Sequence, residues 1–170
     1  MWLRVIIILI LMSLVAAVQL AFLPNFILAS SLNLALVVLV LMVFVGSRRN
    51  ALFCAMTLGL LFDAWSFYWF GAQTLVFTGL TAASFMAVDN FFTNKSLYSY
   101  LFIIALATIV YDLYWLLIAS WPGVLVLGSG FVWVELQKIG LNLALGVLLF
   151  YLALGLSNSF QSVILVKRKY

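Results

Sequence analysis

The sequence predicts an all-α integral membrane protein with six transmembrane helices, forming a single bundle over residues 1–170. The chain is 68% hydrophobic and only 7% charged, whereas soluble domains carry about 25% charged residues. Lipid must therefore be its main solvent. A span needs roughly 20 residues, so this length fits five or six spans and short turns. The positions of the basic residues, described below, favour six.

The first two expected spans cover residues 5–23 and 26–45, and a proline turn separates them. Pro24 cannot continue a helix, and it biases the residue before it away from helical dihedral angles. The second span closes with a glycine and the basic pair Arg48 and Arg49, a pattern typical of a helix end.

The remaining four expected spans are separated by two polar or glycine-containing turns and one long irregular stretch. Gly71 follows the third span, a polar loop over 89–96 follows the fourth, and a Pro/Gly-containing stretch follows the fifth. The sixth span begins between Phe131 and Ile139. Their expected ranges are 51–67, 72–88, 97–119 and 135–156.

The basic residues predict the orientation of the bundle. Six spans place all of them except Lys138 on one side of the membrane, and five spans would split them. The positive-inside rule makes that side cytoplasmic, so both termini are expected in the cytoplasm. The basic residues on that side are Arg4, Arg48, Arg49, Lys95, Lys167, Arg168 and Lys169.

Composition argues against most enzyme classes. The chain has no histidine and a single cysteine, Cys54, which removes imidazole ligands, thiolate clusters and intrachain disulfides. It also has no H-E-x-x-H, G-x-S-x-G or P-loop motif. We therefore expect no catalytic residue, cofactor or metal site. The basic residues lie singly or at span ends, so the expected surroundings are the lipid bilayer and not nucleic acid.

Two aspartates lie inside apolar runs, where a charge is costly and usually faces the bundle interior. Asp63 and Asp112 each lie about 20 Å from the cytoplasmic start of their spans, at 1.5 Å per residue. A sixth helix that begins at Phe131 brings Lys138 to a similar depth. We hypothesise that Lys138 is the counter-ion of Asp63 or Asp112, although it can also form a surface pair with Glu135 three residues away.

Ala55, Gly59 and Asp63 share one face of the third span, because they are spaced four residues apart. Small residues let helices approach closely, which would bring the Asp63 carboxylate against a neighbouring span. Three roles stay open for the two aspartates: hydrogen-bonded structural groups, partner docking, and handling of a ligand or proton. The aromatic cluster over 65–70 is typical of a membrane-interface belt.

The spacing of these residues resembles that of a known family. Gly59, Asp63 and Gly71, followed by Asp112 in a later span, resemble the bacterial rod shape-determining protein family MreD. The Pro24 turn, the length and the basic ends also resemble that family. In place of the small Ser/Gly-rich turn common there, this chain has bulky residues after Asp63. The structural or partner-docking candidates are Pro24, Gly59, Asp63, Gly71, Asp112 and Lys138.

The resemblance implies a non-enzymatic component of the cell-wall elongation complex in the bacterial plasma (inner) membrane. It implies an MreC-like single-span partner and, through it, an MreB-like filament and peptidoglycan synthases. The implied fold is similar to the six-helix substrate-binding subunits of energy-coupling-factor transporters. That similarity supplies an alternative function: a membrane subunit that binds a small, vitamin-type molecule with Asp63 or Asp112 in its pocket.

Overall fold

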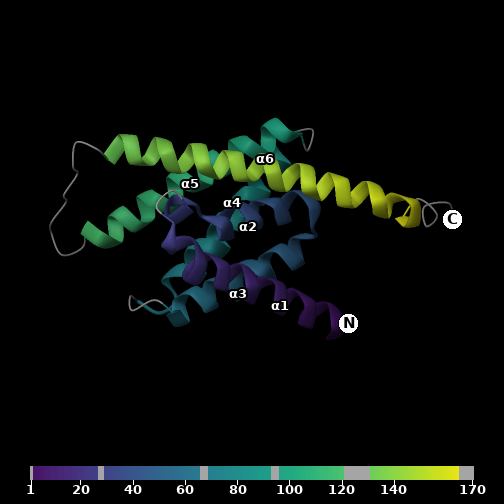
Figure 1. The fold of residues 1–170 in the computed structure, drawn as a ribbon, viewed down its shortest axis with the longest axis horizontal. Coiled ribbons are helices and arrows are strands. Elements are labelled where there is room, and N and C mark those ends of the chain that lie inside the picture. The colour runs from purple at the N-terminus through teal and green to yellow at the C-terminus, as the bar shows by residue number, and fades with distance from the viewer. Residues whose placement is uncertain (1, 27–28, 66–68, 93–95, 121–130, 165–170) are drawn as a thin grey trace.

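All regular secondary structure in the described part of the computed structural model is helical, and no strand occurs there. Figure 1 shows how the helices are arranged. The described residues are 2–26, 29–65, 69–92, 96–120 and 131–164. The helices are α1 (Trp2–Ala17), α2 (Leu34–Val45), α3 (Arg48–Trp65), α4 (Ala72–Phe91), α5 (Leu97–Ser120) and α6 (Phe131–Ile164).

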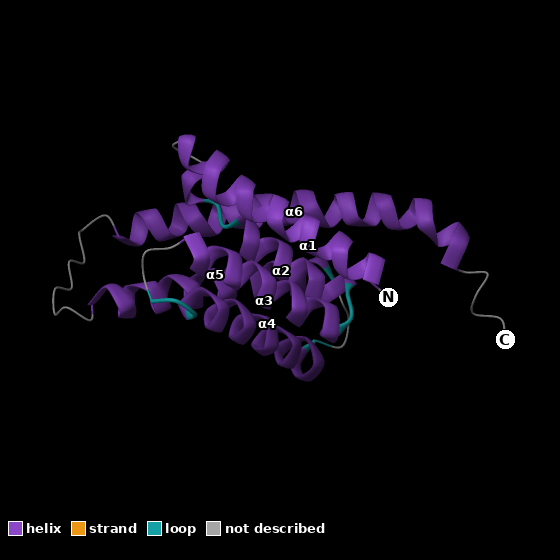
Figure 2. Ribbon diagram, turned by 90° about the horizontal axis from the view of Figure 1, so that it is seen from below, coloured by secondary structure: helices purple, strands orange, loops and turns teal. Residues whose placement is uncertain are grey.

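The helices run up and down between two ends of the bundle. The start of α1 and the end of α6 lie at the same end in both ribbon views (Figures 1 and 2). Arg48 at the start of α3 forms an ion pair with Asp89 near the end of α4, so these two helices are antiparallel. The end of α5 and the start of α6 lie at the opposite end.

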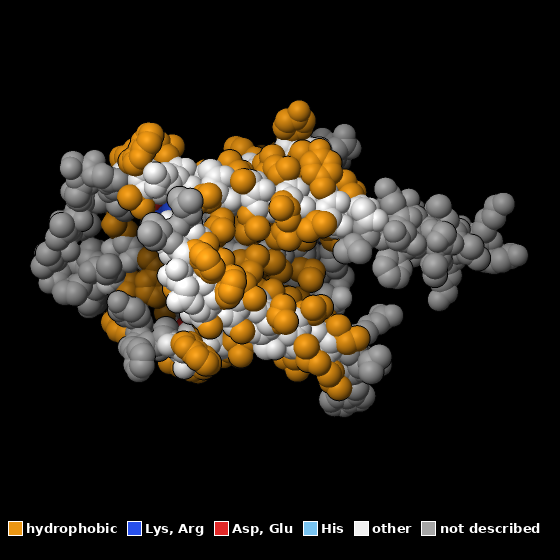
Figure 3. Space-filling model, in the orientation of Figure 1, with side chains coloured by type: hydrophobic (Ala, Val, Ile, Leu, Met, Phe, Trp, Pro, Cys, Tyr) orange, Lys and Arg blue, Asp and Glu red, His pale blue; other side chains and the backbone are white. Residues whose placement is uncertain are grey.

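Within the described residues, three helical segments are long and apolar enough to cross a membrane: Ile6–Asn25, Leu97–Ile118 and Val132–Gly155. These correspond to the first, fifth and sixth expected spans. Large apolar side chains are exposed along them, and Figure 3 shows hydrophobic side chains over much of one face. Such a surface suits lipid, because a water-soluble protein rarely exposes large contiguous apolar patches. The six-span arrangement and the side of each terminus stay predictions.

The second expected span differs most from the structure. Helix α2 begins at Leu34, eight residues after the expected start at 26, and is preceded by a 3-10 turn at Ala29–Ser31. Its 12 residues reach about 18 Å at 1.5 Å per residue, short of the roughly 30 Å of hydrocarbon. Asn33 sets the helix start, because its side chain accepts a hydrogen bond from the Leu36 N–H.

The other boundaries differ by smaller amounts. The first helix continues beyond α1 through a π-helical segment, Val18–Phe22, and a 3-10 turn, Leu23–Asn25, which contains Pro24. Helix α4 extends three residues past 88, and α6 extends on both sides of 135–156. The expected end of the third span at 67 lies outside the described residues.

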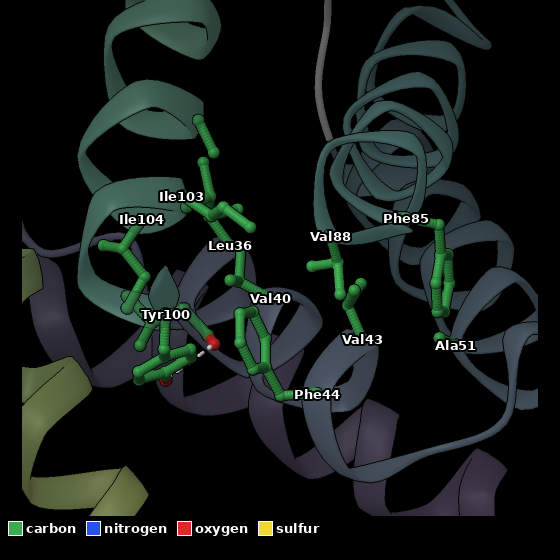
Figure 4. Packing of buried hydrophobic residues seen from close by; sticks show 12 residues of the cluster. Leu36, Val40, Val43, Phe44, Ala51, Phe85, Val88, Tyr100, Ile103 and Ile104 are labelled. Atoms are coloured by element: carbon green, nitrogen blue, oxygen red, sulfur yellow. Dashed lines mark hydrogen bonds between the residues drawn. The ribbon is translucent and has the colours of Figure 1, made fainter. Parts of the chain in front are cut away.

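Helix α2 lies at the centre of the bundle, in contact with each of the other five α-helices. Its apolar side chains pack against α4 and α5: in Figure 4, Val43 of α2 lies beside Val88 of α4, and Leu36 of α2 lies near Ile103 of α5. A second cluster joins α1, α3 and α4 around Met12, Leu58 and Phe77. This packing fixes the helices relative to one another and thereby positions the polar groups between them.

Candidate functional site

The Asp63 carboxylate caps the first turn of α4. Its Oδ1 accepts a hydrogen bond from the Gln73 N–H at 2.8 Å. Its Oδ2 accepts from the Thr74 N–H at 3.0 Å and from the Thr74 hydroxyl at 2.6 Å. Asp63 is only 2% exposed. A carboxylate at a helix N-terminus is favoured by the helix dipole and satisfies amide groups that have no partner within the helix.

Gly59 lies one helical turn before Asp63 and allows α3 and α4 to meet. A Cβ atom built on Gly59 would lie 2.3 Å from Thr74 Cα and 2.8 Å from Thr74 N. These neighbours are backbone atoms, so they cannot move aside as a flexible side chain can. Glycine at 59 therefore sets the close approach that brings the Asp63 oxygens within reach of the Thr74 amide.

Gly71 directly precedes α4 and has a φ of 95°. Side chains with a Cβ rarely adopt this left-handed region, whereas glycine enters it without steric cost. The chain reverses here between α3 and α4, and Leu75 N–H donates to the Gly71 carbonyl to begin the helix. Gly59, Asp63 and Gly71, which the sequence singled out together by their spacing, thus act at one helix junction.

Two tyrosines on α5 fasten the same junction. The Tyr114 hydroxyl donates to the Ala72 carbonyl at 3.2 Å, and the Tyr111 hydroxyl donates to Gln73 Oε1 at 3.3 Å. The Tyr111 ring also stacks on Phe77 of α4, with centroids 5.7 Å apart. The Asp63 carboxylate is thus enclosed in a fixed hydrogen-bonded structure. This geometry corresponds to the structural role among the three that the sequence left open.

Lys138 lies between two carboxylates near the junction of α5 and α6. Its Nζ is 3.3 Å from Asp112 Oδ1 and 3.0 Å from Glu135 Oε1. Of the two counter-ions expected from the sequence, Asp112 is the one that contacts Lys138. The pair with Glu135 also forms, so the two sequence alternatives occur together. Only 28% of the Lys138 side chain and 17% of each carboxylate side chain are exposed.

We expect Lys138→Met to lower the free energy of unfolding by about 1–3 kcal/mol, because two largely buried carboxylates would lose their shared cation. Chemical unfolding of the purified protein in detergent measures the change. The double variant Lys138→Met with Glu135→Gln should recover part of the loss, since it removes one unpaired charge. A Lys138→Met protein as stable as the wild type would contradict a structural role for the pair.

A polar cavity of about 220 Å³ lies beside this ion pair. It is bounded by the irregular segment before α2 and by α5 and α6. Nine of its ten lining residues are polar or charged or carry a hydroxyl, the exception being Leu32. The lining residues are Gln19, Ser30, Ser31, Leu32, Asn33, Thr108, Tyr111, Asp112, Lys138 and Asn142.

Two amide side chains from distant segments support the backbone where α2 begins. Gln19 accepts from the Leu34 N–H at 2.6 Å and donates to the Leu32 carbonyl at 2.8 Å. Asn142 Oδ1 accepts from the Asn33 N–H at 2.8 Å, and its Nδ2 donates to the Thr108 hydroxyl at 3.2 Å. These bonds satisfy backbone groups that a continuous helix would satisfy itself, so they stabilise the interruption of the second span.

We expect Asn142→Leu to cost about 2 kcal/mol of folding free energy, because Asn142 is 1% exposed and its loss leaves the Asn33 N–H without this acceptor. Equilibrium unfolding in detergent is the measurement. Asn25→Leu is a matched amide control at an exposed position whose side chain bonds only one turn back, to Ala21. Equal losses in the two variants would argue against the bracing role of Asn142.

Sequence reasoning did not assign roles to Gln19 and Asn33. Their signal was present, since each is an amide in or beside an apolar run, and such groups in a membrane protein need internal partners. The pairing itself joins residues up to 109 positions apart, which spacing within one span does not reveal. Trp65, Trp69 and Phe70 of the aromatic cluster are strongly exposed at the α3–α4 end, and 66–68 lie outside the described residues.

No protein-family model, curated protein or solved structure matches this chain. Among the described residues, no three acidic, histidine or cysteine side chains are grouped so that they could hold a metal ion.

Proposed function

We propose that this chain is a non-enzymatic, multi-pass component of the bacterial plasma (inner) membrane that scaffolds the cell-wall elongation complex, as its resemblance to MreD implies. The observation that carries the proposal is the shared junction of Gly59, Asp63 and Gly71. These resemblance residues hold α3 against α4 through the hydrogen bonds of a buried carboxylate. Residues used in this way support a rigid framework, which a scaffold requires.

The proposed partners follow from the same resemblance. An MreC-like single-span protein is the direct partner, with an MreB-like filament and peptidoglycan synthases held through it. The exposed apolar side chains of α1, α5 and α6 offer membrane-embedded surface for lipid and for a partner helix. Association of helices within lipid depends on close packing and not on the hydrophobic effect, so an apolar surface does not preclude specific contacts.

The test is a pull-down of the tagged full-length chain from its native membrane in mild detergent, with mass spectrometry of the proteins retained. We expect enrichment of a single-span MreC-like protein or of wall synthases over an unrelated tagged multi-span protein expressed at the same level. Enrichment of transporter ATPase subunits instead would contradict the scaffold function. Asp89→Ala, at an exposed ion pair on α4, should retain the same partners as the wild type.

A second function is favoured by the polar cavity, which a subunit that binds a small molecule would need. Its volume of about 220 Å³ lies below the roughly 300–1,000 Å³ of pockets for drug-sized ligands. Asp63 does not line it, whereas Asp112 does. This second candidate therefore takes a ligand smaller than a typical vitamin, and it predicts a bound molecule detectable by mass spectrometry of the denatured, purified protein.

A further inference from the structure

The charged groups beside the polar cavity carry an excess of negative charge. Asp112 and Glu135 contribute two carboxylates, whereas Lys138 contributes one ammonium within 3.3 Å of both. With all three groups ionised, the cluster carries one uncompensated negative charge. Asp112 and Lys138 line the cavity and Glu135 does not, so Asp112 is the carboxylate that presents negative charge to a molecule inside it.

The backbone N–H groups and the ammonium group beside the cavity already donate to protein acceptors. The backbone N–H groups of Asn33 and Leu34 donate to Asn142 and Gln19, and Lys138 donates to both carboxylates. An anion would have to displace these acceptors, whereas a cation can add to the Asp112 carboxylate, whose two oxygens have more lone pairs than the one bond from Lys138 uses. The electrostatics of the cavity therefore favour a positively charged occupant.

The volume of the cavity limits the size of the cation that it can hold. About 220 Å³ corresponds to roughly seven water molecules at about 30 Å³ each. A monovalent metal ion that keeps part of its water shell fits this space, and so does a primary ammonium group. A divalent ion would turn the single excess negative charge of the cluster into an excess positive charge, whereas a monovalent ion neutralises it. The irregular backbone before α2 lines the cavity, as non-helical backbone in membrane proteins does at water-filled cavities and at cation sites.

We propose that the polar cavity between the start of α2, α5 and α6 binds a small monovalent cation, with Asp112 and Glu135 supplying its negative charge. This binding is independent of the scaffold function, because it depends on the cavity and not on any protein partner. A scaffold with a bound cation and a scaffold without one make the same predictions in the pull-down.

Thermal unfolding of the detergent-purified full-length chain tests the proposal, with tryptophan fluorescence as the readout. The protein is heated in sodium, potassium, methylammonium or N-methyl-D-glucamine chloride at one ionic strength, the last being by far the bulkiest of the four cations. A ligand that binds the folded state raises the midpoint. We expect a midpoint about 3 °C higher in at least one small cation than in N-methyl-D-glucamine. Comparing the midpoints in sodium and potassium with the midpoint in methylammonium shows whether the cavity binds a metal ion or an ammonium group.

Three variants separate specific binding from a general salt effect. Glu135→Gln should reduce the cation-dependent shift, since it removes the excess charge. Lys138→Met should lower the midpoint in N-methyl-D-glucamine and enlarge the shift, because the small cation then replaces the missing ammonium. Asp89→Asn removes a carboxylate at the other end of the bundle and should leave the shift unchanged.

Equal midpoints of the wild type in all four salts would overturn the proposal. A shift that is the same in the wild type and in Glu135→Gln would also overturn it. If Lys138→Met does not fold in any of the salts, the comparison of Glu135→Gln with Asp89→Asn decides the question alone, because each removes one carboxylate charge.

Discussion

Asp63→Ala is expected to lower the free energy of unfolding by about 3–5 kcal/mol, the largest single effect among the substitutions considered. The variant leaves the N–H groups of Gln73 and Thr74 and the Thr74 hydroxyl without the acceptors they have in the structure. Each buried donor left unpaired costs about 1–3 kcal/mol. The measurement is equilibrium unfolding in detergent, supported by the yield of folded protein from membranes.

Two controls distinguish the cap from a general effect of removing an aspartate. Asp63→Asn keeps the shape of the side chain and one oxygen acceptor, so it should cost less than the alanine variant. Asp89→Ala removes an exposed carboxylate paired with Arg48 and should change stability by less than about 1 kcal/mol. If Asp63→Ala is as well tolerated as Asp89→Ala, the Asp63 carboxylate does not hold the α3–α4 junction.

Gly59→Ala and Gly79→Ala are expected to change stability in opposite directions. At 59 the new Cβ would lie 2.3 Å from Thr74 Cα, so the backbones of α3 and α4 must separate, at a cost of about 2–3 kcal/mol. At 79, within α4, a Cβ would meet nothing within 4 Å, and alanine should add up to about 1 kcal/mol by helix propensity.

The same chemical change at two helical glycines makes this comparison a test of the helix approach alone. Unfolding midpoints of both variants and of the wild type are measured under one detergent condition. A destabilised Gly79→Ala together with a neutral Gly59→Ala would contradict the packing of the Thr74 backbone against Gly59.

The long elements of the fold follow from the sequence because each is a long apolar run between strong breaks. The start of α5 at Leu97 and the start of α4 at Ala72 were both expected, since a polar loop and Gly71 precede them. The delayed start of α2 was not expected. By hydropathy, residues 26–45 form one apolar run. The helix nevertheless begins only at Leu34, because Gln19 and Asn142 from distant segments hydrogen-bond to the backbone before it.

The candidate sites show the same division between local and long-range information. The four-residue spacing of Gly59 and Asp63 indicated a shared face on α3, and both do face the start of α4. A common depth for Asp112 and Lys138 was inferred from counting residues, and the two form an ion pair. The cavity was not foreseen, because it arises where three separate segments fail to fill the space between them.

The proposed function assumes six membrane crossings, and the crossings of α3 and α4 are the part of that arrangement that can be tested most directly. Neither is among the three helical segments that are long and apolar enough to count as spans among the described residues. Their 18 and 20 residues reach about 27 and 30 Å at 1.5 Å per residue, which suffices for the hydrocarbon core. If both helices cross, the α3–α4 turn lies on the opposite side of the membrane from the start of α3 and the end of α4.

Labelling of single cysteines in intact cells measures this directly. Cys54 is replaced by alanine, and a single cysteine is introduced at one exposed position. The positions are Asn50 near the start of α3, Asn90 near the end of α4, and Phe70 in the α3–α4 turn. With a membrane-impermeant maleimide, Phe70→Cys should be labelled in intact cells, and Asn50→Cys and Asn90→Cys only after permeabilisation. Labelling of all three from one side would contradict the six-span arrangement.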